Sequence, residues 1–149
     1  MLAHESRHLC SWLTFNVSRR QMNAKLPTPI PQVPVRDLAR AIEFYQSQLG
    51  FSLDWKYEDG IAGVSRERTR LFLDRVSEGA FHPVRIWLNL DSLSEVDALH
   101  REWKKTGVSI SSAPAQKPWG LYEFIAEDCD GNSYRIFYDT ETPKKQKTG

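Results

Sequence analysis

Two stretches of the chain have the hydrophobic spacing of amphipathic helices. In the first, apolar residues recur every three or four positions between Asp37, a suitable N-cap, and Gly50, a suitable helix end. The second follows Ser92 and Glu95, which have capping-box spacing, and ends at Gly107. The apolar positions are Leu38, Ala41, Ile42, Tyr45 and Leu49 in the first helix and Val96, Leu99, His100 and Trp103 in the second.

Alternating and β-branched runs around these helices predict strands. Pro31 and Pro34 exclude a helix at the start, so the chain should be extended there, as an edge strand or a crossing arm. Asp59-Gly60 and Asp130-Gly131-Asn132 are turn signals for hairpins. The predicted strands are 30–35, 51–57, 61–66 and 70–75 in the first half and 84–90, 108–111, 122–126 and 133–138 in the second.

The order βαβββ therefore occurs twice. The predicted helix starts, Asp37 and Asp91, are 54 residues apart, and the helix ends, Gly50 and Gly107, are 57 apart. This repeat predicts an α+β fold of two tandem modules, at about 28–76 and 83–139, within one domain at 26–143. Residues 1–25 are expected to be a poorly ordered extension and 144–149 a basic tail.

Composition and charge narrow the possible functions. Residues 26–143 carry 13 Lys and Arg against 18 Asp and Glu, a net charge of −5 that disfavours a nucleic-acid partner and suits a cationic ligand. No apolar run approaches the roughly 18 residues that cross a membrane. Cys10 and Cys129 have neither disulfide-framework nor metal-ligand spacing, which favours a reducing, cytoplasmic setting.

The segment 117–132, KPWGLYEFIAEDCDGN, is the most informative about function. Pro118 and Gly120 form a turn that holds Trp119 between them, ahead of the predicted hairpin. A tryptophan fixed in such a turn is a candidate ligand contact. The alternative is that Trp119 packs on the hairpin that it precedes.

Four segments in this order resemble the vicinal-oxygen-chelate superfamily, which includes glyoxalase I, ring-cleaving dioxygenases and bleomycin resistance proteins. They are LPTPIPQVPVRDLARAIEFYQSQLGF, SLDWKYEDGIAGVSRERTRLFLDRV, IWLNLDSLSEVDALHREW and PWGLYEFIAEDCDGNSYRIF, and together they span 26–139. The resemblance is greatest to the bleomycin resistance proteins. It implies a curved mixed sheet that forms a cleft.

The enzymes of this superfamily place metal ligands, mostly His and Glu, on the first and last strands of each half. The matching positions here are Ile30, Arg85, the run 71–73 (LFL) and Arg135, none of which suits a divalent cation. The resemblance therefore implies no metal, no cofactor and no catalytic residue. The alternative is an enzyme of the same superfamily that acts on a small metabolite.

In the bleomycin resistance proteins, as the resemblance implies, a homodimer exchanges N-terminal strands and sequesters the unmodified drug in clefts between the subunits. Aromatic rings grip the planar bithiazole of the drug, and acidic groups face its cationic parts. A third alternative is a binding protein for an unrelated hydrophobic molecule, and Trp55 and Trp87 could instead be core residues. The matching ligand positions are Asp54, Trp55, Ile61, Trp87, Trp119, Gly120 and Tyr122.

Overall fold

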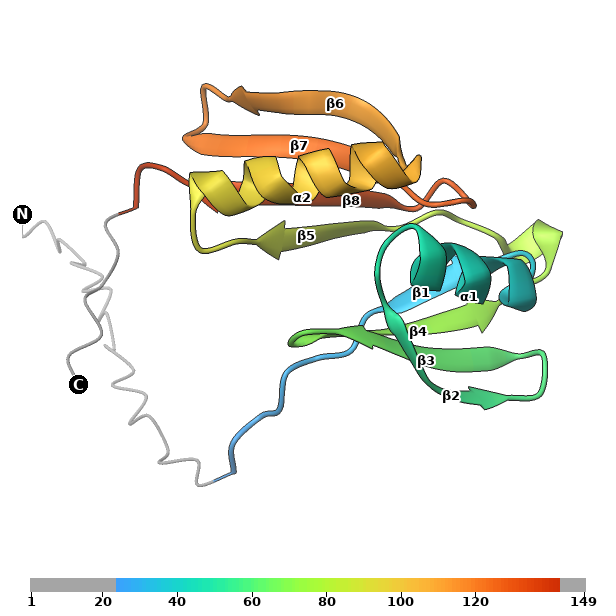
Figure 1. Cartoon of the computed structure of the whole chain (residues 1–149). Helices are drawn as coiled ribbons and strands as arrows, with labels where there is room; N and C mark the ends of the chain where they lie inside the picture. Colours follow the sequence, from blue (N-terminus) through green and yellow to red (C-terminus); the bar gives the residue numbers. More distant parts are fainter. Residues whose placement is uncertain (1–23, 143–149) are drawn as a thin grey trace, which may run out of the picture.

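The computed structural model describes residues 24–142, which form two βαβββ modules (Figure 1). Except for residues 24 and 25, the predicted extension lies outside the described residues, as does the predicted tail, and the domain limits stay predictions. In the first module β1 pairs with β4 in parallel, and the other pairs are antiparallel, in the order β1-β4-β3-β2. The elements are β1 (Gln32–Val35), α1 (Leu38–Ser47), β2 (Ser52–Tyr57), β3 (Ile61–Arg66) and β4 (Thr69–Arg75).

The second module repeats this topology with the strand order β5-β8-β7-β6. The predicted α+β fold of tandem modules is therefore confirmed. Within the described residues, neither α1 nor α2 is long and apolar enough to cross a membrane. The elements are the 3-10 helix η1 (Glu78–Ala80), β5 (Arg85–Asn89), α2 (Leu93–Thr106), β6 (Ser109–Gln116), β7 (Leu121–Glu127) and β8 (Ser133–Asp139).

Both helices begin where local chemistry predicts. The Asp37 carboxylate accepts a hydrogen bond from the Arg40 backbone N–H at 3.0 Å, as an N-cap does. Ser92 Oγ accepts from the Glu95 N–H at 3.2 Å, and the Glu95 carboxylate accepts in return from the Asp91 N–H, one residue before the cap, at 2.9 Å. At the other end, Gly107 has a φ of 91°, a left-handed value that favours glycine.

Two predicted strands differ from the structure by more than one residue at an end. The first strand begins at Gln32 rather than at residue 30, and residues 24–31 before it have no regular secondary structure. The strand predicted at 108–111 continues as β6 to Gln116 and includes Pro114. Proline lacks the N–H that a ladder requires, but β6 is an edge strand, so Pro114 is tolerated there.

A single hydrophobic core joins the two modules. Tyr45 of α1 meets Tyr134 of β8 edge to face, with ring centroids 6.4 Å apart. Trp103 of α2 is 2% exposed, and its indole N–H donates to the Leu49 carbonyl at 3.4 Å. Trp103, one of the apolar positions that the sequence assigns to this helix, thus lies in the core. Other fully buried core residues include Val33, Leu38, Leu71, Leu73, Phe124 and Ile136.

The turn between β7 and β8, the Asp128–Asn132 turn, ties the modules together through polar groups. Asp128 Oδ2 accepts from the Tyr45 hydroxyl at 2.7 Å and from the Asn132 side-chain amide at 2.8 Å. The same amide donates to the Pro34 carbonyl at 2.8 Å, and the Asn132 Oδ1 accepts from the Val84 N–H at 3.0 Å. Burial raises the pKa of Tyr45 well above its ordinary value, so the hydroxyl keeps its proton and donates.

Replacing Asp128 by Asn should lower the free energy of unfolding by about 2–3 kcal/mol, because an amide would set one N–H donor against another. Both carboxylate oxygens accept hydrogen bonds, Oδ1 from the N–H groups of Asp130 and Asn132 and Oδ2 from Tyr45 and Asn132. Urea denaturation measures the loss. Asp59→Asn, in the exposed β2–β3 turn, is the control and should leave the midpoint nearly unchanged. Equal stability of Asp128→Asn and wild type would contradict the role of this turn.

Candidate functional site

Each sheet has one face packed against its helix and one face that carries exposed aromatic residues. In the first sheet, Trp55 lies opposite Gly63 and Gly63 opposite Phe72, while the neighbouring pair Ala62 and Leu73 is fully buried on the helix side. The second sheet repeats the pattern, since Trp87 of β5 is 47% exposed. We call these surfaces the first and second aromatic faces. Exposed aromatic clusters of this kind often mark binding surfaces.

The first aromatic face is built around Trp55, whose ring lies across Gly63. A Cβ added to Gly63 would be 2.4 Å from the Trp55 indole nitrogen, so glycine leaves the space that the ring fills. Phe72 meets Trp55 edge to face with centroids 5.2 Å apart. Beside the ring, Asp54 accepts a hydrogen bond from Ser65 Oγ at 2.8 Å. These residues border a hollow of about 330 Å³.

The second aromatic face has Arg135 at its centre. The Arg135 guanidinium carbon lies 4.5 Å from the centroid of the Trp87 ring and 5.9 Å from that of Trp119. Phe137 meets Trp87 edge to face, with centroids 5.7 Å apart. A guanidinium and three aromatic rings therefore form one surface.

A buried carboxylate holds this face in place. Glu123 is fully buried, and its Oε1 lies 3.0 Å from Arg135 Nη2. Its Oε2 accepts a hydrogen bond from the Trp119 indole N–H at 3.4 Å. Because a buried charge is costly without a partner, Glu123 fixes both the cation and the tryptophan.

The remaining predicted site residues lie in three places. Gly120 has a φ of 83°, and a Cβ there would lie 2.5 Å from the Glu141 carboxyl carbon, so it shapes the turn that carries Trp119. Ile61 is on the first aromatic face, opposite Tyr57. Tyr122 lies on the helix side of its sheet, where its hydroxyl donates to Asp97 of α2 at 2.6 Å.

The structure thus brings Trp87 and Trp119 together and places Asp54, Trp55 and Ile61 on the other sheet. The sequence analysis did not include Phe72, Phe137 and Glu123 among the site residues, and it considered Arg135 only as an unsuitable metal ligand. Alternation along β4 and β8 offered a signal for the two phenylalanines, because each lies between two residues that face the helix.

Residues 29–136 match the profile of the Glyoxalase/Bleomycin resistance protein/Dioxygenase superfamily. The chain belongs to this superfamily. Members of the superfamily include both enzymes and drug-binding proteins, so membership alone leaves the activity open. A comparison with curated proteins gives no match.

Solved structures of the superfamily share the fold. A bleomycin-binding protein from bleomycin-producing Streptomyces verticillus, complexed with copper(II)-bleomycin, is similar with a TM-score of 0.64 and 24% identity, covering 76% of this chain and 96% of that chain. A lactoylglutathione lyase from Agrobacterium tumefaciens is similar with a TM-score of 0.62 and 19% identity, covering 78% and 97%. A superfamily protein from Nocardioides has a TM-score of 0.67 and 22% identity, covering 89% and 97%.

The metal positions implied by the superfamily do not fit a metal ion in this chain. Leu71 and Leu73 are fully buried apolar side chains, and Arg135 is a cation that already pairs with Glu123. Across residues 24–142, no group of three or more His, Cys, Asp or Glu is arranged to hold a metal.

Replacing Glu123 by Ala should lower the free energy of unfolding by about 3–5 kcal/mol, because Arg135 would be left with its charge unpaired. The double variant Glu123→Ala/Arg135→Ala should recover part of this loss, since it leaves neither charge behind. Chemical denaturation of both variants measures the difference. Glu127→Ala, on the same strand but half-buried, is the control and should cost far less. A double variant less stable than Glu123→Ala would show that the ion pair does not dominate.

Proposed function

We propose that the protein binds a planar glycopeptide antibiotic of the bleomycin type and sequesters it without chemical change. The observation that carries this proposal is the pair of aromatic faces, on which Trp55, Trp87 and Trp119 are 42%, 47% and 55% exposed. Exposed tryptophan costs free energy in water unless a partner covers it. A flat heteroaromatic ligand is a suitable partner, because it stacks on each ring.

The fold is similar to that of a bleomycin-binding protein, which supports this ligand class. The hollow beside Trp55 is lined by one carboxylate, Asp54, and one cation, Arg70. Asp54 can face a cationic part of the ligand, as the family resemblance implies, and Arg70 can face an anionic or hydrogen-bond-accepting part. On the second face, the Arg135 charge is compensated by Glu123, so stacking there does not depend on a charged ligand.

We further propose that the binding unit is a twofold homodimer in which each cleft combines the first aromatic face of one copy with the second aromatic face of the other. The hollow beside Trp55 is lined by residues of the first module and the segment before it. Ligand pockets usually enclose most of a ligand, which one open face does not do. β1 is an edge strand of the first sheet, and β5 is an edge strand of the second. The chain before β1 is exposed, so it can serve as an arm that is exchanged between two copies.

Replacing Trp119 by Ala should weaken bleomycin binding by about 2 kcal/mol or more, roughly thirtyfold, as expected for an aromatic hot spot. Isothermal titration measures this change, and the melting temperatures of Trp119→Ala and Trp119→Phe should fall by a similar small amount, because the side chain is half exposed and both variants lose the N–H that Glu123 accepts. Trp119→Phe is the matched control, since it keeps a flat ring and loses only the N–H that reaches Glu123. A wild-type protein that does not bind bleomycin would refute the proposed ligand.

The shared clefts predict a specific result when homodimers of two binding-deficient variants are mixed. Trp55→Ala and Trp119→Ala homodimers should each bind poorly, because every cleft lacks one ring. After exchange of subunits, each heterodimer should contain one intact cleft, so an equal mixture should regain about one quarter of the wild-type sites. Titration of the mixture counts these sites, and sedimentation checks that the protein is a dimer. A monomer, or a mixture with no regained sites, would exclude clefts shared between copies.

A further inference from the structure

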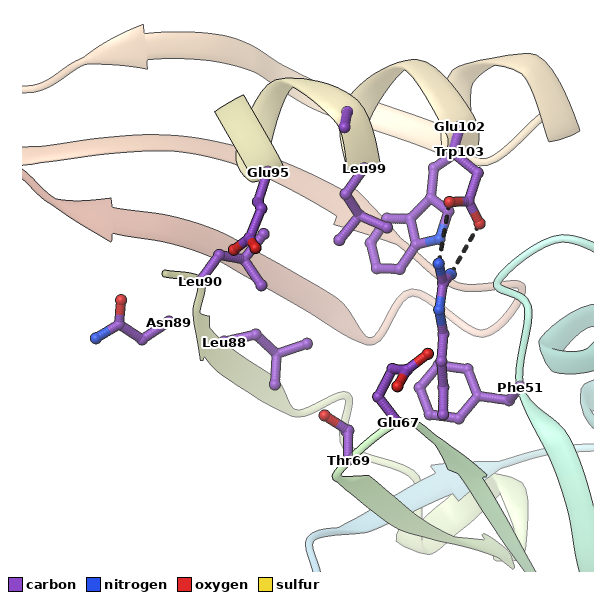
Figure 2. Close-up of a pocket in the computed structure, with 12 residues that line it drawn as sticks. Phe51, Glu67, Thr69, Leu88, Asn89, Leu90, Glu95, Leu99, Glu102 and Trp103 are labelled. Carbon is purple, nitrogen blue, oxygen red and sulfur yellow. Dashed lines mark hydrogen bonds and ion pairs between the residues drawn. The ribbon is translucent and has the colours of Figure 1, made fainter. Parts of the chain in front are cut away.

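A separate pocket of about 450 Å³ lies between the two modules (Figure 2). The first module contributes Phe51 and the β3–β4 turn, and the second contributes the end of β5 and one side of α2. None of Trp55, Trp87 and Trp119 lines this pocket, so the pocket is distinct from the aromatic faces.

The floor of this pocket is apolar. Phe51 and Trp103 are 6% and 2% exposed and belong to the core that both modules share. Leu88, Leu90 and Leu99 are partly buried and pack against that core. The pocket therefore offers a ligand a preformed apolar surface, the usual basis of small-molecule binding.

The charged groups around the pocket are mainly acidic. Glu67, Glu95 and Glu102 line it together with a single cation, Arg66. Arg66 is already engaged, since its Nη1 donates to the Leu49 carbonyl at 2.7 Å and its Nη2 donates to Glu102 at 3.0 Å. Its charge is therefore compensated by Glu102.

Two carboxylates are left without a cationic partner among the described residues. Glu95 accepts only the capping hydrogen bond from the Asp91 N–H at 2.9 Å, and Glu67 has no hydrogen-bond or ion-pair partner in residues 24–142. Figure 2 draws Glu95 on α2 at one side of the pocket and Glu67 beside Phe51 at the other. Together they give the pocket a negative potential over an apolar floor.

We propose that this pocket binds an amphiphilic organic cation, namely an aromatic or aliphatic body that bears one ammonium group. The body fills the space over Trp103 and Leu99, and the ammonium group lies near Glu67 or Glu95. An anion of the same shape is disfavoured by the uncompensated carboxylates, and a neutral analogue lacks the charge attraction. This inference does not depend on the antibiotic-binding role of the aromatic faces.

The test uses three probes of one shape: 4-phenylbutylammonium, 4-phenylbutan-1-ol and 4-phenylbutyrate. Indole N–H signals in a nitrogen–proton correlation spectrum of the full chain report each tryptophan separately, with Trp103 assigned by its loss in Trp103→Phe. The ammonium probe should shift the Trp103 signal saturably, and the signals of Trp55, Trp87 and Trp119 should stay in place. The alcohol should bind more weakly and the carboxylate most weakly.

Two variants locate the site and its charge. Ala98→Phe fills the pocket from α2 and should weaken ammonium binding at least about tenfold, a change that the titration resolves as a lost shift. Glu67→Gln should weaken it by about threefold, as expected for an exposed ion pair. Glu58→Gln is a matched control, because Glu58 and Glu67 both occupy hairpin turns with positive φ, 47° and 51°, and Glu58 does not line the pocket.

Three results would overturn the inference. Equal binding of all three probes would remove the charge selectivity, and unchanged binding to Ala98→Phe would place the site elsewhere. A Trp103 shift seen only when the protein is diluted to monomers, as judged by sedimentation, would show that a second copy of the chain covers the pocket.

Discussion

The Asp128–Asn132 turn is the constraint on which the arrangement of the two modules depends. Its buried carboxylate and side-chain amide contact α1, β1 and the residue before β5, so one turn fixes three elements that are distant in sequence. Arg36 adds an ion pair to Asp130 at 3.4 Å and lies over the Phe81 ring at 3.7 Å, which attaches the segment between the modules. A hydrophobic core alone allows sliding, whereas these directional bonds set the relative position of the modules.

The contact between the two modules determines which surfaces remain available for binding. Both helices take part in this contact, since α1 packs on β8 through Tyr45 and α2 donates to Leu49 through Trp103. The opposite side of each sheet is then left to carry aromatic residues. Where the two modules do not meet closely, between α2 and the β3–β4 turn, the pocket remains. The two kinds of candidate site thus follow from one packing arrangement.

Sequence predicted what depends on local chemistry. Caps and helix stops act within a few residues, so Asp37, Ser92 and Gly107 identified the helices. The extent of β6 was missed because Pro114 discourages a strand unless the strand lies at an edge, and edge position is a property of the whole sheet. The helix ends could be predicted because they depend on neighbouring residues, and the end of β6 could not because it depends on the arrangement of the whole sheet.

The candidate site shows the same limit. Trp55, Trp87 and Trp119 were found as aromatic residues on strands and in a turn, but the role of Arg135 depends on Glu123 of the neighbouring strand. That contact is diagonal, because Arg135 lies opposite Ile125 and Glu123 opposite Phe137 in the ladder. The face of the sheet on which Tyr122 lies could have been predicted from the alternation of β7, because residues two apart on a strand share a face and Phe124 is buried on the helix side.

Energetics connect the proposed ligand to the proposed dimer. Stacking of a flat ring on an aromatic side chain contributes roughly 1–3 kcal/mol, by analogy with nucleic-acid bases. Two such contacts on one face give about 2–6 kcal/mol, and loss of translational and rotational freedom costs at least about 4 kcal/mol. One face alone therefore binds no more tightly than the millimolar range. Three contacts over two faces, one for each exposed tryptophan, leave up to about 5 kcal/mol, which corresponds to a dissociation constant of roughly 0.2 mM, more than a hundredfold tighter than one face alone. Trp55 lies on one sheet and Trp87 and Trp119 serve the other, so the proposed dimer would gain its affinity by placing both faces on one ligand.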